Sequence, residues 1–220
     1  MIEKYPLPLA LESILPVLLA AIGLFLIARS LKRKNEIIGE LAYIGATLIV
    51  AGQSLPALWR LLRATNGSDF YWLNNASLVL IAPGSICLAW ALWRGLRGTA
   101  SKATAGSVWL MPLFLNAGFM AITAASRVIL GGRVWFTILS TLATLAGIAI
   151  LLQLTLRAIH HRLSFAALLF LFSLAMSLML PRLIGNGVES MAAEWTRQIS
   201  NTISQGAFAF AAFQLSRKES

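Results

Sequence analysis

The feature that most constrains this chain is a series of seven long apolar segments. They lie near residues 8–30, 37–61, 72–93, 106–126, 134–156, 165–185 and 188–215. Each has about the 20 residues that a helix needs to cross the roughly 30 Å hydrocarbon layer of a bilayer. Runs of this length are too long for membrane strands, and lipid requires backbone polar groups to be satisfied internally. The sequence therefore predicts an all-α polytopic membrane protein, a single seven-helix transmembrane domain over residues 1–220 with no soluble domain.

The composition agrees with this class. Hydrophobic residues make up 58% of the chain and charged residues only 12%, with a mean hydropathy of +0.78. A soluble domain carries about 25% charged residues. We therefore interpret the net charge of +10 as a signal of membrane topology, and we expect no nucleic-acid partner.

The short connections divide the charges unevenly. One set of connections, with the charged residues next to them, holds eleven basic and three acidic residues. This set consists of segments 31–36, 94–105, 157–164 and 216–220. The other connections hold seven basic and five acidic residues. The positive-inside rule then predicts a multi-pass protein of a cell membrane (inner or plasma membrane), with its N-terminus outside and its C-terminus inside. The tryptophans agree, because Trp59, Trp72, Trp135 and Trp195 fall at predicted outer ends and Trp90, Trp93 and Trp109 at predicted inner ends.

Polar residues within the predicted spans concentrate in the outer half of the membrane. On the last segment Glu194, Arg197, Asn201 and Gln205 recur every three or four positions, so they share one helical face. A charged group inside a membrane is costly unless it faces water or a partner. Polar faces at one depth therefore predict an outward-open, hydrated pocket. Its other members are Glu12, Gln53, Arg60, Asn116, Arg127 and Arg182.

Arginine outnumbers glutamate in this predicted pocket. Guanidinium groups bind carboxylates and phosphates through paired hydrogen bonds, so the ligand is predicted to be small and anionic or zwitterionic. Arg60, Arg127 and Arg197 are the predicted anion contacts, and Glu194 is the predicted counter-ion or proton carrier. The ligand would be oriented by the amides of Gln53, Asn116, Asn201 and Gln205. The alternative for each residue is structural: an arginine near a helix end reaches the interface, and an amide joins two helices.

Small residues and prolines mark where the helices are expected to approach or bend. The stretches AAIG (20–23), AGQS (51–54) and APGS (82–85) predict close helix–helix contacts. Prolines inside the segments permit kinks. They are Pro16, Pro56, Pro83, Pro112 and Pro181.

No cofactor or metal is expected. Seven crossings with an external N-terminus are also the layout of microbial rhodopsins, and this chain resembles those proteins in topology only. Their retinal is held by a lysine within the last helix, whereas the lysines here lie in loops or near the termini, so covalent retinal is excluded. They are Lys4, Lys32, Lys34, Lys102 and Lys218. His160 and His161 lie in a basic loop and offer no haem site, and the single cysteine, Cys87, rules out an internal disulfide and a thiolate metal cluster.

The sequence contains no catalytic motif that would indicate an enzyme. There is no HExxH, and Asp69 is the only aspartate. Transport of the bound ligand is the leading hypothesis for this bilayer protein. Two alternatives stay open: a non-transporting sensor or accessory subunit whose basic cytoplasmic loops dock a partner protein, and an outer-face lipid-modifying enzyme with Glu12 or Glu194 as its base.

Overall fold

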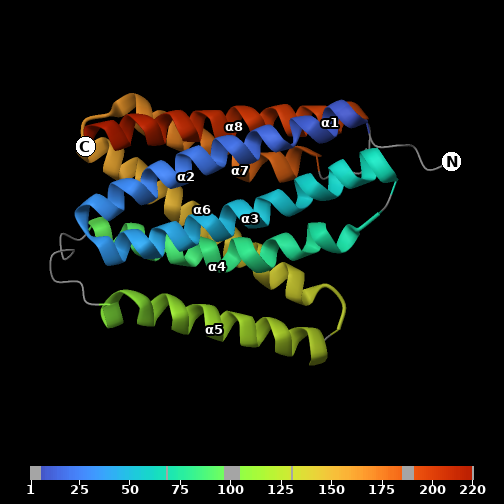
Figure 1. Cartoon of the computed structure of the whole chain (residues 1–220), viewed down its shortest axis with the longest axis horizontal. Coiled ribbons are helices and arrows are strands. Elements are labelled where there is room, and N and C mark those ends of the chain that lie inside the picture. Colours follow the sequence, from blue (N-terminus) through green and yellow to red (C-terminus); the bar gives the residue numbers. More distant parts are fainter. Residues whose placement is uncertain (1–5, 68, 97–104, 130, 185–190, 220) are drawn as a thin grey trace.

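A computed structural model describes residues 6–67, 69–96, 105–129, 131–184 and 191–219, and all regular structure in these residues is helical. The predicted all-α class is therefore confirmed for this part of the chain. Its helices are α1 (Leu7–Glu12), α2 (Ile14–Lys34), α3 (Glu36–Asn66), α4 (Tyr71–Leu96), α5 (Ala105–Ile129), α6 (Val134–His160), α7 (Ser164–Ile184) and α8 (Met191–Lys218) (Figure 1).

Several helices extend beyond the predicted apolar segments, because the residues that cap them lie in the connections. The side-chain oxygen of Asn35 accepts a hydrogen bond from the Ile38 amide at 3.0 Å and so caps the start of α3. At the other end Gly67 has a φ of 67°, a left-handed conformation that glycine adopts without steric cost. The segment predicted to end at residue 61 therefore continues by more than one turn.

The first predicted segment is interrupted at Ser13, between α1 and α2. Pro16 accounts for the position of this break. Its ring lacks an N–H donor and clashes with the carbonyl four residues earlier, which belongs to Glu12. The Ser13 hydroxyl instead donates to the Ala10 carbonyl oxygen at 2.6 Å. The interruption agrees with the bend predicted at this proline.

Six helices form a closed ring in the order α2, α3, α4, α6, α7, α8, with α8 contacting α2 again. The fifth helix, α5, lies outside the ring against α4 and α6, at the lower edge of Figure 1. We call the end of the ring at which α8 begins the Met191 end, and the end at which it finishes the Lys218 end. They correspond to the right and left sides of Figure 1, and to the predicted outer and inner sides of the membrane.

Five helical spans of the described residues are long and apolar enough to cross a membrane. They are Leu7–Lys34, Glu36–Thr65, Tyr71–Leu96, Gly106–Ile129 and Val134–His160. A further apolar stretch, Ser164–Met179, is shorter, and the polar residues in the first half of α8 lower its hydropathy. Large apolar side chains cover the outside, above all on α5, where Phe114 is 72% exposed. Such a surface is favourable in lipid and unfavourable in water, so these features indicate a membrane protein.

The three small-residue stretches each contain a glycine at a close helix contact, which confirms that prediction. A Cβ on Gly52 of α3 would lie 2.8 Å from a backbone oxygen of α4, and one on Gly84 of α4 would lie 2.8 Å from the Gly45 carbonyl oxygen of α3. A Cβ on Gly23 of α2 would lie 2.5 Å from the Phe208 ring of α8. Only glycine lets these helices approach so closely.

The main hydrophobic core fills the Lys218 half of the ring. Its largest fully buried members come from α2, α3, α4, α6, α7 and α8, and include Leu31, Leu41, Leu92, Leu154, Phe170 and Leu215. The tryptophans divide between the two ends as predicted. Trp59 Nε1 donates to Asp69 Oδ1 at 2.8 Å at the Met191 end, and Trp90 Nε1 donates to the Val108 carbonyl oxygen at 3.0 Å near the Lys218 end.

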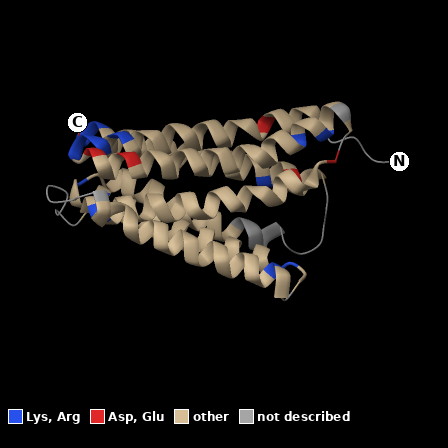
Figure 2. Cartoon of the chain, turned by 60° about the horizontal axis from the view of Figure 1, so that its bottom comes forward, with Lys and Arg blue, Asp and Glu red and all other residues tan. Residues whose placement is uncertain are grey.

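A buried ionic cluster around Glu219 closes the Lys218 end, where basic side chains gather (Figure 2). One carboxylate oxygen of Glu219 lies 2.5 Å from Arg157 Nε, 3.1 Å from Lys34 Nζ and 3.1 Å from His161 Nε2. The Glu219 side chain is 1% exposed and that of Arg157 3%. Burial alone would raise the pKa of the Glu219 carboxyl, but the charges of Arg157 and Lys34 outweigh it and hold this pKa below its usual range.

Candidate functional site

A cavity of about 190 Å³ lies inside the ring, and all six ring helices contribute to its wall. The cavity borders the hydrophobic core, because Leu24, Ile150 and Phe208 belong to both the cavity wall and the core. It lies on the side of the core that is nearer the Met191 end. Much of the wall is apolar. Its polar side chains are Gln53, Ser85, Ser173, Ser177, Ser204 and Gln205.

The two glutamines are the longest polar side chains that line this cavity. Neither the Gln53 nor the Gln205 side chain makes a hydrogen bond within the described part of the chain, so each leaves an amide donor and acceptor for a ligand. Both were predicted site residues, from α3 and α8, and the structure brings them into one wall. A small polar molecule could therefore exchange its hydration for hydrogen bonds from two sides.

The cavity serines were not predicted as site residues. Ser173 Oγ lies 3.0 Å from the Leu169 carbonyl oxygen and 2.9 Å from that of Ser204, so it ties α7 to α8. Ser177 Oγ donates to the Leu174 carbonyl oxygen at 2.8 Å. These hydroxyl protons are used by the backbone, while the oxygens can still accept hydrogen bonds. The sequence did contain a signal for them, because Ser173 and Ser177 lie four residues apart, on one helical face of an otherwise apolar segment.

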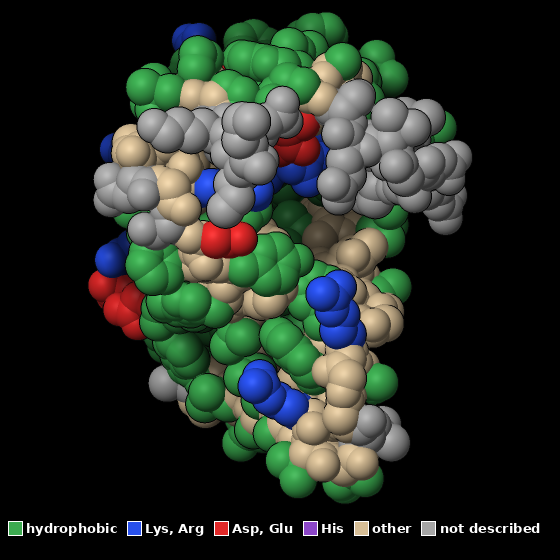
Figure 3. Space-filling view, turned by 90° about the vertical axis from the view of Figure 1, so that its right-hand side faces the viewer, with side chains coloured by type: hydrophobic (Ala, Val, Ile, Leu, Met, Phe, Trp, Pro, Cys, Tyr) green, Lys and Arg blue, Asp and Glu red, His purple; other side chains and the backbone are tan. Residues whose placement is uncertain are grey.

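Three predicted residues meet in an ionic triad at the Met191 end. Arg60 Nε of α3 lies 3.8 Å from Glu194 Oε1 of α8, and Arg197 Nη2 donates to the same oxygen. The triad carries one net positive charge. Figure 3, which looks onto this end, shows acidic and basic side chains beside a hollow. In the ring α2 lies between α3 and α8, so the contact between Arg60 and Glu194 joins two helices that are not ring neighbours.

The triad and the cavity lie along the same two helices. Arg60 follows Gln53 by seven residues on α3, and Gln205 follows Arg197 by eight on α8. At a rise of 1.5 Å per residue these separations are about 10–12 Å. A ligand arriving from the Met191 end would meet the charges before the amides.

Glu12 also contacts α8, but through Thr202 and not through a residue of the ionic triad. Its Oε1 accepts a hydrogen bond from Thr202 Oγ1, and its Oε2 is buried without a partner in the described part of the chain. Asn201, on the same helix, is partly buried and does not line the central cavity. Gln198, one turn closer to the Met191 end, is buried with an unpartnered amide nitrogen among the described residues. Sequence reasoning missed Gln198 and Thr202.

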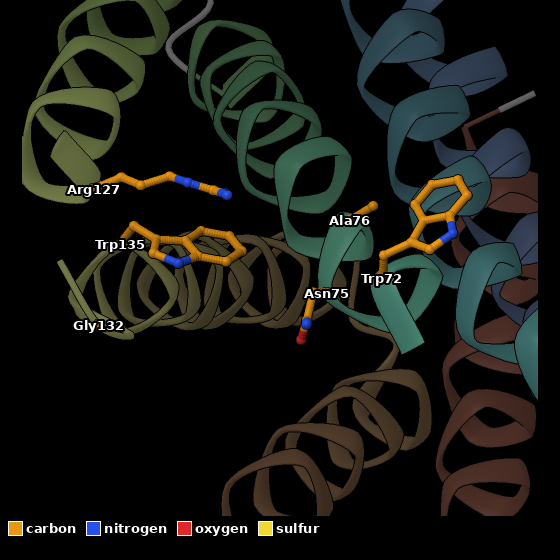
Figure 4. A pocket seen from close by; sticks show the side chains of 6 residues that line it. All are labelled: Trp72, Asn75, Ala76, Arg127, Gly132 and Trp135. Carbon is orange, nitrogen blue, oxygen red and sulfur yellow. The ribbon is translucent and has the colours of Figure 1, made fainter. Parts of the chain in front are cut away.

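The two predicted residues on α5 lie outside the ring. Arg127 lines a separate cavity of about 490 Å³ between α4, α5 and α6, and its guanidinium carbon lies 5.6 Å from the centre of the Trp135 ring. Figure 4 shows this pair on one side of the cavity and Asn75 and Ala76 of α4 on the other. Asn116 Nδ2 donates to Cys87 Sγ of α4 at 3.5 Å. Neither residue lines the central cavity, and the side chain of Arg182 lies outside the described residues.

The described residues contain no group of three or more histidine, cysteine, aspartate or glutamate side chains that could hold a metal ion. The central cavity and the ionic triad offer hydrogen-bonding groups and one net positive charge. No protein-family model, curated protein or solved structure matches this chain.

Proposed function

We propose that this chain is a seven-span cell-membrane protein that binds a small zwitterionic or anionic solute in the central cavity and transports it. The observation that carries the proposal is the cavity, which all six ring helices line and in which Gln53 and Gln205 keep unused amide groups. Its volume of about 190 Å³ corresponds to about six water molecules at 30 Å³ each. The cavity therefore suits a solute of about the size of a small amino acid or carboxylic acid.

In this proposal α7 and α8 cross the membrane together with the five apolar spans, and the Met191 end faces outward. The gathering of basic side chains at the Lys218 end supports the orientation (Figure 2). The low hydropathy of α8 is compatible with a crossing, because Ser204 and Gln205 turn toward the cavity. Polar groups that face an internal, hydrated space are tolerated at membrane depth.

The ionic triad would admit the solute. Two guanidinium groups around one carboxylate attract a second carboxylate, with Glu194 as the counter-ion that the solute partly displaces. Since the contact between Arg60 and Glu194 joins α3 to α8 at the Met191 end, it would break as the solute passes and re-form behind it. The triad thus supplies an outer gate for alternating access.

Removal of the two amides is the direct test. The double variant Gln53→Leu/Gln205→Leu is expected to lower solute uptake at least tenfold, because each leucine keeps the volume of the wall and removes its hydrogen bonds. Uptake is measured in proteoliposomes with radiolabelled glycine, alanine, acetate and lactate. The wild-type protein is expected to raise the uptake of at least one of these solutes above that of empty liposomes.

The matched control is Gln214→Leu, a change of the same kind on α8 at a position that does not line the cavity. Its uptake should stay within twofold of wild type. Thermal unfolding in detergent verifies that both variants fold. Wild-type liposomes that take up none of the four solutes, or a double variant as active as wild type, would contradict the proposal.

One observation favours a second function, a sensor or accessory subunit that binds the solute without moving it. The hydrophobic core closes the Lys218 half of the ring, and the polar lining of the cavity does not continue through it. Equilibrium binding of a radiolabelled solute that depends on Gln53 and Gln205, with no flux in the liposomes, would select this function over transport.

A further inference from the structure

A second cavity, remote from the central one, lies on the outside of the ring at the Lys218 end. It has a volume of about 180 Å³ and is formed by α2 and α8. Three arginines line it: Arg29 and Arg33 from α2, and Arg217 from α8. We call it the arginine groove. It plays no part in the proposed solute pathway.

The chemistry of the arginine groove matches a phosphate group. The hydroxyl-bearing residues Ser30 and Ser216 complete its polar lining, and no carboxylate is among the described residues that form it. Glu219, which follows α8, is bound by Arg157 and Lys34 and does not line the groove. Three guanidinium groups in one small lining favour an anion, and guanidinium groups bind phosphate oxygens in pairs.

The position of the groove indicates that this phosphate belongs to a lipid. Leu26 of α2 and Phe213 of α8 form its apolar side, and the Arg217 guanidinium carbon lies 5.7 Å from the centre of the Phe213 ring. On α2 the apolar side chains continue away from the groove at four-residue intervals through Ile22 and Leu18, each 55% exposed. An apolar surface that ends in arginines at the end of a membrane-spanning helix accommodates an acyl chain below a charged head group.

We propose that the arginine groove binds the phosphate of one anionic phospholipid, with an acyl chain along Leu26, Ile22 and Leu18. The small volume fits one phosphate, and the described lining holds no carboxylate side chain that could pair with an ammonium group, so a head group without an ammonium group is preferred. The groove thereby selects phosphatidylglycerol over phosphatidylcholine, whose ammonium group would be repelled. The lipid would join α2 to α8 at the seam where the ring closes.

Native mass spectrometry of the purified full chain tests this assignment. The protein in detergent is mixed with equal amounts of phosphatidylglycerol and phosphatidylcholine, and the wild type is expected to retain one phosphatidylglycerol molecule at least fivefold more than phosphatidylcholine. The triple variant Arg29→Gln/Arg33→Gln/Arg217→Gln is expected to retain at least tenfold less phosphatidylglycerol. A separate arm with inorganic phosphate alone is expected to give no retained adduct.

The matched control is Lys32→Gln/Arg162→Gln/Lys218→Gln. It removes three exposed positive charges near the same end of the bundle, none of which lines the groove. Its retention of phosphatidylglycerol should stay within twofold of wild type. If the triple groove variant does not fold, the single variants Arg29→Gln and Arg217→Gln are used, and each should lower retention at least threefold.

Three results would overturn the proposal. They are equal retention of the two lipids by the wild type, equal losses in the groove variant and the charge-matched control, and an inorganic phosphate adduct as abundant as the lipid adduct. The second would indicate that net charge alone attracts the lipid. The third would make the groove a site for a soluble phosphate. None of them depends on solute uptake, so this test and that of the central cavity fail independently.

Discussion

Replacement of Glu219 by glutamine is expected to lower the free energy of unfolding by about 3 kcal/mol, the lower end of the range for breaking a buried ion pair. Arg157 is the reason for so large an effect. Its Nη1 and Nη2 are buried without a hydrogen-bond partner in the described part of the chain, and its Nε contacts Glu219. The variant therefore leaves a buried charge with only a neutral amide beside it. The loss is measured as a lower midpoint of thermal unfolding in detergent.

The same carboxyl group is expected to make stability depend on pH. Because its folded pKa is held below the usual value for glutamate, its stabilising contribution is complete above the unfolded pKa of about 4.3. That contribution is lost as pH falls through the lower folded pKa, when the folded state must take up the proton. The difference between wild type and Glu219→Gln should therefore be largest at neutral pH and shrink in acid.

Two further variants distinguish a local ion pair from a general effect of charge. Glu40→Gln removes a carboxylate that is exposed on α3, so it should change the unfolding midpoint little. The double variant Arg157→Leu/Glu219→Leu removes both buried charges and should be more stable than Arg157→Leu or Glu219→Leu alone. If the two single changes simply add in the double variant, Arg157 and Glu219 are not coupled.

Alanine at Gly45 is expected to destabilise the protein by about 1–3 kcal/mol, the usual cost of overpacking a tight contact. The new Cβ would lie 2.7 Å from the Gly84 carbonyl oxygen and 2.8 Å from the Leu88 backbone nitrogen. Both atoms belong to the backbone of α4, so no side-chain rotation can relieve the clash. The two helices must separate, which weakens the contact between α3 and α4.

Gly118→Ala on α5 is the matched control, because its Cβ would meet nothing within 4 Å. There the better helix propensity of alanine should stabilise the protein slightly, by up to about 1 kcal/mol. The same substitution is thus expected to have opposite signs at two helical glycines. Equal unfolding midpoints for the two variants would contradict the close approach of α3 and α4.

The sequence predicted the helices and their close contacts, because both depend on local residue types. Apolar length specifies a helix in a membrane, and a glycine such as Gly52 or Gly84 leaves room that a neighbouring helix uses. The contact between Glu194 and Arg197 was likewise readable from their spacing. Seven crossings and the orientation stay predictions beyond the five spans that the structure identifies.

The order of the helices around the ring could not be predicted from the sequence. The spacing of polar residues shows which side of a helix is polar, but not which neighbouring helix that side contacts. Arg60, Arg127 and Arg197 were therefore assigned to one pocket. The structure joins Arg60 and Arg197 through Glu194, whereas Arg127 lies against Trp135 on the outer helix. The exposed large side chains of α5 are mostly apolar, and such a surface gains no hydrophobic free energy by entering the ring rather than facing lipid.

The closed ring has a consequence for biosynthesis. α2, α3 and α4 contact their neighbours in sequence and can assemble as soon as they are made, whereas α2 receives α8 only after most of the chain exists. The hydrogen bonds that join these regions span 185 positions between Lys34 and Glu219 and 190 between Glu12 and Thr202. Until then the face of α2 around Gly23 stays exposed to lipid or to a chaperone. Folding is thus expected to end in one slow, long-range step, the docking of α8, and arrest before that step would leave an open and aggregation-prone ring.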